Sequence, residues 1–145
     1  MTIGGLRRRG RDRICYQGKV SQLLRSTLKP RKTQIGAYEL IAAIMGVLQG
    51  QDIQVSSMGI RYFVDYNPVR QGIVRATSKQ PDLINLIGMI WFVTGKVMWR
   101  YWCSYVRSCS NLADAPSRGD FSVRTQIGAR VLAAAFTRCI TFAEK

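Results

Sequence analysis

Carboxylates are scarce in this chain, which has 8 Asp plus Glu against 22 Lys plus Arg, so each acid is worth locating. Asp65 ends the β-rich run 60–65, Ile-Arg-Tyr-Phe-Val-Asp. An acid at the end of a buried strand is often functional, because ligands of α/β sheets bind beyond the strand ends. Asp65 could instead cap a helix that begins near Pro68. The local pattern leaves both interpretations open.

Two other acids belong to predicted helices, Glu39 within one and Asp114 near the start of another. Apolar residues recur every three or four positions from Gln34 to Leu48, which predicts an amphipathic helix. Glu39 is the only acid in this helix, and the usual interpretation of such a residue is a surface glutamate facing water. Asp114 lies in 112–118, which looks like the start of another helix.

The remaining patterns predict a mixed α/β chain with one sheet covered by helices. Thr2–Leu6 and Ile14–Val20 predict a β-hairpin around a polar, arginine-rich turn over Arg7–Arg13. Further helices are expected at 68–76, 83–98 and 125–144, with Asp82 as a possible cap, and a strand at 99–107. In that strand the alternation predicts one buried face, formed by Trp99, Tyr101, Cys103 and Tyr105.

The net charge of +14 and a pI near 10.4 indicate a polyanionic partner. Nucleic acid is the commonest such partner and an anionic membrane surface is a less common one. The run Arg7–Arg13 could contact phosphates or form a solvated loop. The longest apolar stretch, 83–99, is interrupted by polar residues and favours a buried helix over a membrane span.

The four cysteines form no Cys-x-x-Cys pair, and the chain has no histidine, so a zinc site is not expected. The arginine-rich N-terminus lacks the apolar core of a secretory signal. We therefore expect reduced cysteines that act as small apolar residues, in a protein of the cytoplasm or nucleus that is not secreted.

Two stretches, with a short strand between them, carry a resemblance to a known family. The first is Pro30-Arg31-Lys32-Thr33-Gln34-Ile35 followed by Glu39-Leu40-Ile41-Ala42, and the strand is Phe63-Val64-Asp65. The second is Val106-Arg107-Ser108 with Ser110-Asn111-Leu112-Ala113-Asp114-Ala115-Pro116-Ser117-Arg118. In this order and spacing the set resembles the ribonuclease H domain of eukaryotic retrotransposon polyproteins. Asn-x-Ala-Asp-x-Pro-Ser-Arg is its most specific element.

The resemblance implies a ribonuclease H-like mixed sheet flanked by helices over 1–121, followed by a helical tail over 122–145. It implies catalytic, metal-ligating carboxylates at Glu39, Asp65 and Asp114, which would hold two Mg²⁺ or Mn²⁺ ions. The family has a fourth carboxylate on its first, central strand. Thr2–Val20 resembles the second and third strands of the family, so we expect an N-terminally truncated domain without that first strand. Asp12 lies in the arginine-rich turn and is not expected to replace the missing ligand.

The implied substrate is an RNA–DNA hybrid, recognised by its backbone and 2′-hydroxyls rather than by base sequence. The residues expected to contact nucleic acid are Arg31, Lys32, Asn67, Arg70, Asn111, Ser117 and Arg118. We expect no membrane partner and no small-molecule substrate, and either a monomer or part of a larger polyprotein.

Two other functions remain open. The chain could be a catalytically dead retroelement remnant that binds nucleic acid through its basic surface. It could also be an unrelated basic module whose Trp91, Trp99, Tyr101 and Trp102 stack on single-stranded bases. Core packing is the commoner role of such aromatic residues.

Overall fold

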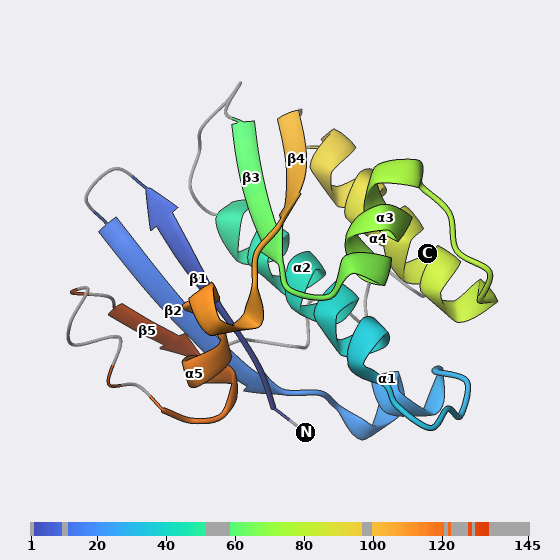
Figure 1. Cartoon of the computed structure of the whole chain (residues 1–145), viewed down its shortest axis with the longest axis horizontal. Coiled ribbons are helices and arrows are strands. Elements are labelled where there is room, and N and C mark those ends of the chain that lie inside the picture. The colour runs from blue at the N-terminus through green and yellow to red at the C-terminus, as the bar shows by residue number, and fades with distance from the viewer. Residues whose placement is uncertain are drawn as a thin grey trace.

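The fold was determined as a computed structural model, which describes residues 2–9, 12–51, 59–96, 100–120, 122, 128 and 130–133. For 2–9, 12–18, 49–51, 59–60, 116–117 and 130–133 only the backbone is described. The elements in chain order are β1 Thr2–Arg9, β2 Asp12–Lys19, α1 Gln22–Ser26, α2 Ile35–Gln51, β3 Gly59–Val64, α3 Asn67–Arg75, α4 Pro81–Lys96, β4 Arg100–Tyr105, the short 3₁₀ helix η1 Ser108–Ser110, α5 Asp114–Ser117 and β5 Arg130–Ala133 (Figure 1).

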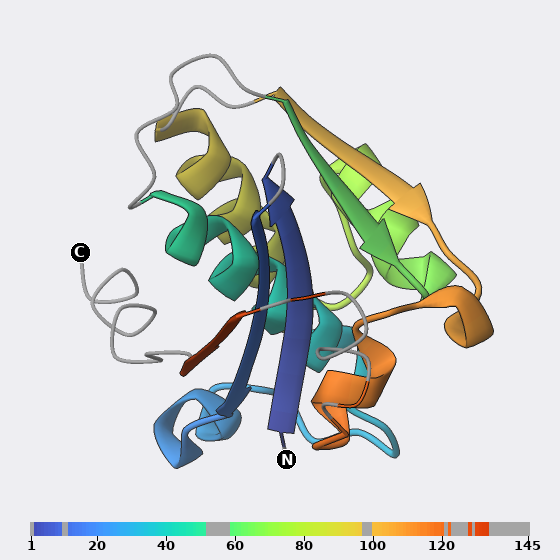
Figure 2. The same ribbon diagram turned by 90° about the vertical axis from the view of Figure 1, so that its left-hand side faces the viewer.

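The strands form two sheets, so the predicted mixed α/β class is confirmed but the single sheet is not found among the described residues. One sheet has the order β1-β2-β5, with β1 and β2 antiparallel and β5 parallel to β2. The other is the parallel pair β3-β4. Figure 2 shows the two sheets on different sides of the long helices α2 and α4.

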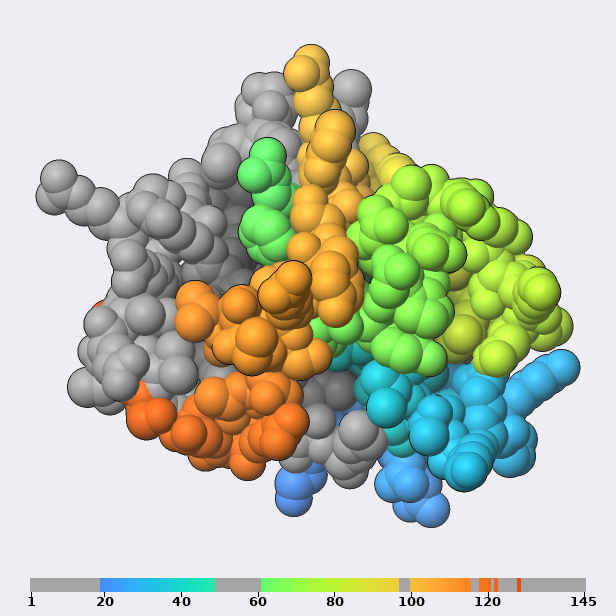
Figure 3. All heavy atoms as spheres, in the orientation of Figure 1, coloured from blue at the N-terminus to red at the C-terminus, as the bar shows by residue number. Residues whose placement is uncertain are grey.

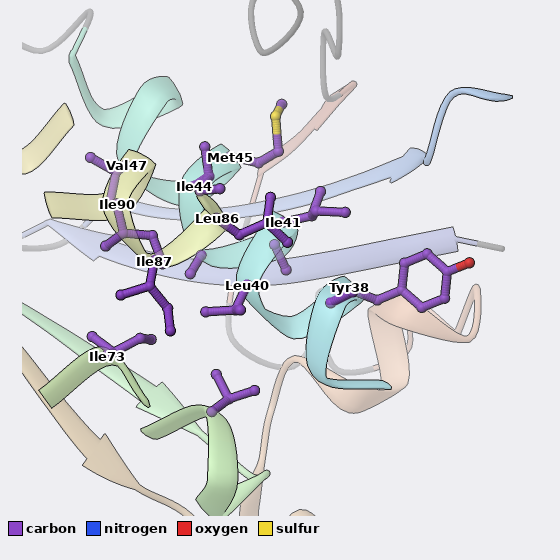
Figure 4. Packing of buried hydrophobic residues seen from close by; sticks show 14 of the residues in the cluster. Tyr38, Leu40, Ile41, Ile44, Met45, Val47, Ile73, Leu86, Ile87 and Ile90 are labelled. Carbon is purple, nitrogen blue, oxygen red and sulfur yellow. The ribbon is translucent and has the colours of Figure 1, made fainter. Parts of the chain in front are cut away.

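Helix α2 runs through the middle of the molecule because it has almost no polar face (Figure 1). Every residue from Ala37 to Leu48 is buried except Glu39 and Gly46, which are partly exposed. A helix that is apolar on all sides must be enclosed on all sides. Helix α4 supplies Leu86, Ile87 and Ile90 against it, and Ile73 of α3 joins the same cluster (Figure 4).

A buried ion pair fixes the segment that leads into α2. The guanidinium of Arg31 donates to Asp82 Oδ1 at the start of α4, and Lys29 N donates to Asp82 Oδ2 at 3.1 Å. Burial raises the pKa of Asp82, but these hydrogen bonds and the Arg31 charge outweigh burial and lower it. Gln34 extends the contact by accepting from Arg31 Nη1 at 2.9 Å. Asp82 therefore links two segments instead of serving as the predicted helix cap.

Two sequence predictions about the ends of the chain are wrong in part. The predicted turn over Arg7–Arg13 is shorter, because β1 continues to Arg9 and β2 begins at Asp12, with Arg9 opposite Asp12 in the register. The helix expected over 125–144 is contradicted at Arg130–Ala133, which is strand β5. The rest of that range lies outside the described residues, apart from Gly128.

The cysteines for which side chains are described are both free thiols. Cys103 is buried on β4, and burial raises its pKa to about 11 although the charge of Arg70 lowers it, so it stays protonated at neutral pH. Cys109 is exposed, contrary to the expectation of a small buried residue. None of the helices in the described ranges is long and apolar enough to cross a membrane.

Two glycines on helices that pack together make a matched test of this packing. A Cβ on Gly72 of α3 would lie 3.0 Å from Ile87 Cδ1 and 3.2 Å from the Thr77 carbonyl oxygen, whereas a Cβ on Gly88 of α4 would meet nothing within 4 Å. Thr77 cannot easily yield, since its N–H donates to Gly72 O at 3.1 Å. We expect Gly88→Ala to stabilise the protein by up to about 1 kcal/mol through helix propensity. We expect Gly72→Ala to destabilise it by about 1 kcal/mol through overpacking.

Urea denaturation of both variants beside the wild type measures this difference. Equal stabilisation by the two alanines would show that α3 and α4 are not in close contact at Gly72.

Candidate active site

Glu39 enters the interior because it is carried by α2. Its neighbours Tyr38 and Leu40 are buried, and Glu39 itself is partly buried. Burial, followed by the negative charges of Asp65 and Asp114, raises its pKa from the ordinary 4.5 to about 7. Glu39 is therefore not the solvated surface glutamate that the sequence pattern alone favoured.

Asp65 is placed by the end of β3. Val64 is fully buried, and Val106 N donates to Val64 O at 2.9 Å, which extends the pairing of β3 with the β4 segment by one residue. Asp65 is the first residue beyond this pairing. The N-cap of α3 is Tyr66, with no side-chain capping bond, so the alternative role of Asp65 as a helix cap is contradicted.

Asn111 holds Asp65 from a segment far away in the sequence. Its Nδ2 donates to Asp65 Oδ2 at 3.1 Å, and its Oδ1 accepts from Ala113 N at 3.1 Å. Its main-chain oxygen accepts from Asp114 N at 3.1 Å. Asn111 thus links the carboxylate after β3 to the turn that presents Asp114, which is a positioning role.

Asp114 begins α5 and pairs with Arg118 one turn later. Arg118 Nε lies 3.2 Å from Asp114 Oδ1 and Arg118 Nη2 lies 3.1 Å from Oδ2. The arginine side chain is 76% exposed, so the pair is weak in energy. The pair nevertheless places a positive charge on the Asp114 carboxylate.

The three predicted carboxylates thus come from α2, the end of β3 and α5, and they lie close enough for Glu39 to respond to the other two. They do not form a complete metal cage, since no group of three His, Cys, Asp or Glu in the described part of the chain is close enough to hold an ion. Carboxylate oxygens are the ligands that Mg²⁺ and Mn²⁺ prefer, so the donor type fits.

A cavity of about 630 Å³ is lined by residues of α2, α3 and α4, and Tyr66, the residue after Asp65, is among its lining residues. Arg31 and Lys32, both predicted to contact nucleic acid, line it together with Arg75 and Lys79, and no acid is among the lining residues. The guanidinium of Arg31 is already bonded to Asp82 and Gln34. Sequence reasoning missed Arg75 and Lys79, because only the packing of α3 beside the start of α2 brings them to the same cavity.

The other residues predicted to contact nucleic acid have only local partners or lie outside the described side chains. Asn67 Oδ1 accepts from Arg70 Nε at 3.0 Å on α3, so these two residues bind each other at the surface. The side chain of Ser117 lies outside the described residues. Asp12 begins β2 instead of lying in the turn.

Comparisons of the chain with protein-family models, curated proteins and solved structures found no significant match.

The raised pKa of Glu39 predicts the pH dependence of stability without divalent metal. Between pH 4.5 and about 7, Glu39 is protonated in the folded state but has lost its proton in the unfolded state. The contribution of Glu39 to the free energy of unfolding is therefore fully present below pH 4.5 and is lost as the pH rises toward 7. The full shift corresponds to at most about 3 kcal/mol. In EDTA, Glu39→Gln should flatten this slope and be more stable than wild type at pH 8. Urea unfolding across this pH range tests it, and an unchanged slope in the variant would contradict the burial of Glu39.

The hydrogen bond between Asn111 and Asp65 predicts energetic coupling between residues 46 positions apart. A double-mutant cycle with Asn111→Ala and Asp65→Ala should give a coupling of about 1 kcal/mol, because the acceptor is a partly buried carboxylate. The control cycle pairs Asn67→Ala with Asp65→Ala and should give no coupling, since Asn67 bonds Arg70 instead. Equal coupling free energies in the two cycles would contradict the positioning role of Asn111.

Proposed function

We propose that this chain is a ribonuclease H-type domain of a retroelement that hydrolyses the RNA strand of RNA–DNA hybrids by two-metal chemistry. One observation carries the proposal. The acids that the family resemblance selected, Glu39, Asp65 and Asp114, come from three separate elements, and yet the charges of Asp65 and Asp114 act on Glu39. Buried clusters of acids with perturbed pKa values are common at functional sites and costly elsewhere.

The order of elements supports the finer fold proposal, a ribonuclease H-like mixed sheet without its first central strand. An antiparallel hairpin, β1-β2, precedes α2, and the parallel strands β3 and β4 follow it. β1 and β3 are each at the edge of their sheet. A strand paired with both of these edges would join the two sheets of the described residues into one.

Glu39, Asp65 and Asp114 are the residues that would hold the ions. When bound, two Mg²⁺ or Mn²⁺ ions supply charge stabilisation to the attacking water and to the leaving oxygen of a phosphodiester. The protein's own contribution is to hold the carboxylates in place. Asn111 restrains the Asp65 carboxylate, β3–β4 pairing fixes its main chain, and α2 keeps Glu39 in a partly desolvated position.

Basic residues at the cavity beside Tyr66 support a nucleic-acid substrate. Lys32, Arg75 and Lys79 are among its lining residues, and the net charge of the chain is +14. Phosphate contacts of this kind are independent of base sequence and weaken as salt rises. We propose an intracellular protein, in the cytoplasm or nucleus, that acts as a monomer or within a larger polyprotein.

A second candidate function is a catalytically dead remnant that still binds nucleic acid. The observation in its favour is that the acids of the described residues do not approach one another closely enough for a metal site. Arg118 also neutralises Asp114 without any ion. The two functions share the basic surface and differ only in cleavage.

Cleavage of a labelled RNA–DNA hybrid with Mg²⁺ or Mn²⁺ tests the proposal. We expect wild-type cleavage to fall to about 1% or less in Asp65→Asn, because the amide cannot serve as an anionic ligand. Asp120→Asn is the matched control and should retain activity, since the Asp120 carboxylate accepts only a local bond from Ser122 N.

The outcomes separate the two functions. Unchanged cleavage in Asp65→Asn would contradict the site assignment. Salt-sensitive hybrid binding without cleavage by the wild type would establish the remnant instead.

A further inference from the structure

The β3-β4 sheet has an inner face that is fully used by packing. Tyr62 and Tyr101 stack with ring centroids 6.3 Å apart, and Trp91 of α4 meets Tyr101 edge-on at 6.0 Å. Val64 and Cys103 are buried on the same face. Trp91 Nε1 also donates to Ile73 O at 3.1 Å, so this tryptophan has a structural partner. These contacts give the aromatic residues of this face a structural role.

The outer face of the same sheet has the opposite character. Side chains alternate along a strand, so Arg61 and Phe63 of β3 share this face with Arg100 and Trp102 of β4. Phe63 is 52% exposed and Trp102 is 66% exposed, the largest exposed fraction among the bulky apolar residues described. Figure 3 shows both strands at the surface of the molecule.

The register sets how the rings and charges are arranged. Arg61 lies directly opposite Trp102, and Phe63 lies opposite Ser104, so the two rings are diagonal neighbours. Diagonal positions of this kind are about 7–8 Å apart, within reach of large side chains. The two arginines are exposed, and in the described part of the chain neither of them forms an ion pair.

This combination favours one class of partner. Exposed rings offer stacking surface to planar groups, and unpaired guanidinium groups beside them attract phosphates. A single-stranded nucleic acid supplies both, with unpaired bases next to each phosphate. A duplex keeps its bases stacked inside and offers no ring to Trp102. A second copy of this chain would bring another charge of +14 to the same surface and is disfavoured by repulsion.

We propose that the outer face of β3-β4 is a binding site for single-stranded nucleic acid. Phe63 and Trp102 stack on bases, and Arg61 and Arg100 contact the flanking phosphates. The site is separate from the carboxylates Glu39, Asp65 and Asp114 and requires no divalent metal. It therefore does not depend on the function proposed above.

The experiment is fluorescence anisotropy with labelled oligothymidylate of about a dozen nucleotides in EDTA. Trp102→Ala should weaken binding roughly tenfold or more, and Trp102→Phe should restore most of it, because stacking needs a ring rather than indole. Arg61→Ala should reduce the slope of log affinity against log salt by about 0.7. A duplex of the same length should bind equally to wild type and Trp102→Ala.

Phe92→Ala is the matched control, since Phe92 is 54% exposed but lies on α4. It should leave oligothymidylate binding unchanged. Equal affinity of Trp102→Ala and Phe92→Ala would overturn the proposal. A large loss of thermal stability in Trp102→Ala but not in Phe92→Ala would also overturn the proposal, because it would mean that another part of the protein covers this face. Concentration-dependent dimerisation that Trp102→Ala abolishes would identify the face as an interface between copies and would also overturn it.

Discussion

The enclosure of α2 is the constraint on which the rest of the structure depends. The helix is apolar on nearly all sides, so it must be covered by α4, by β1 and by the cluster that includes Ile73 of α3. Each buried Leu or Ile on it contributes roughly 1.5–3 kcal/mol relative to exposure. The same enclosure carries one polar group inward. Glu39 cannot turn fully to solvent without moving the core helix, and this is why its carboxyl group is partly desolvated.

The role of each acid in this fold depends on its burial and on the basic residues near it. Asp82 is buried and neutralised by Arg31, so it stabilises the link between α4 and the segment before α2. Removing one partner of such a pair leaves an uncompensated buried charge, which is costly. Glu39 instead lies where the charges of Asp65 and Asp114 act on it, and Asp114 forms an exposed ion pair with Arg118. The interaction of acids from three elements in a strongly basic protein makes this place a candidate for cation binding.

The β3-β4 sheet separates structural aromatic residues from available ones. Tyr101 and Trp102 are adjacent in the chain, but the alternation of a strand turns Tyr101 toward Tyr62 and Trp91 and turns Trp102 to solvent. Core packing was thus the right interpretation for Tyr101 and the wrong one for Trp102. Tyr105, the last residue of β4, is half exposed although its parity is that of Cys103.

The sequence by itself determined the elements that depend on local periodicity. The helices over 34–48, 68–76 and 83–98 and the strands near 60–65 and 99–107 correspond to α2, α3, α4, β3 and β4, since spacing of apolar residues is a property of neighbouring positions. Only the tertiary structure decided what depends on distant partners. Arg130–Ala133 is a strand because β2 pairs with it, Asp65 is held by Asn111 46 positions away, and Asp82 finds Arg31 51 positions away. No local pattern contains these partners, because hydrogen bonds and ion pairs across such separations exist only once the chain has folded.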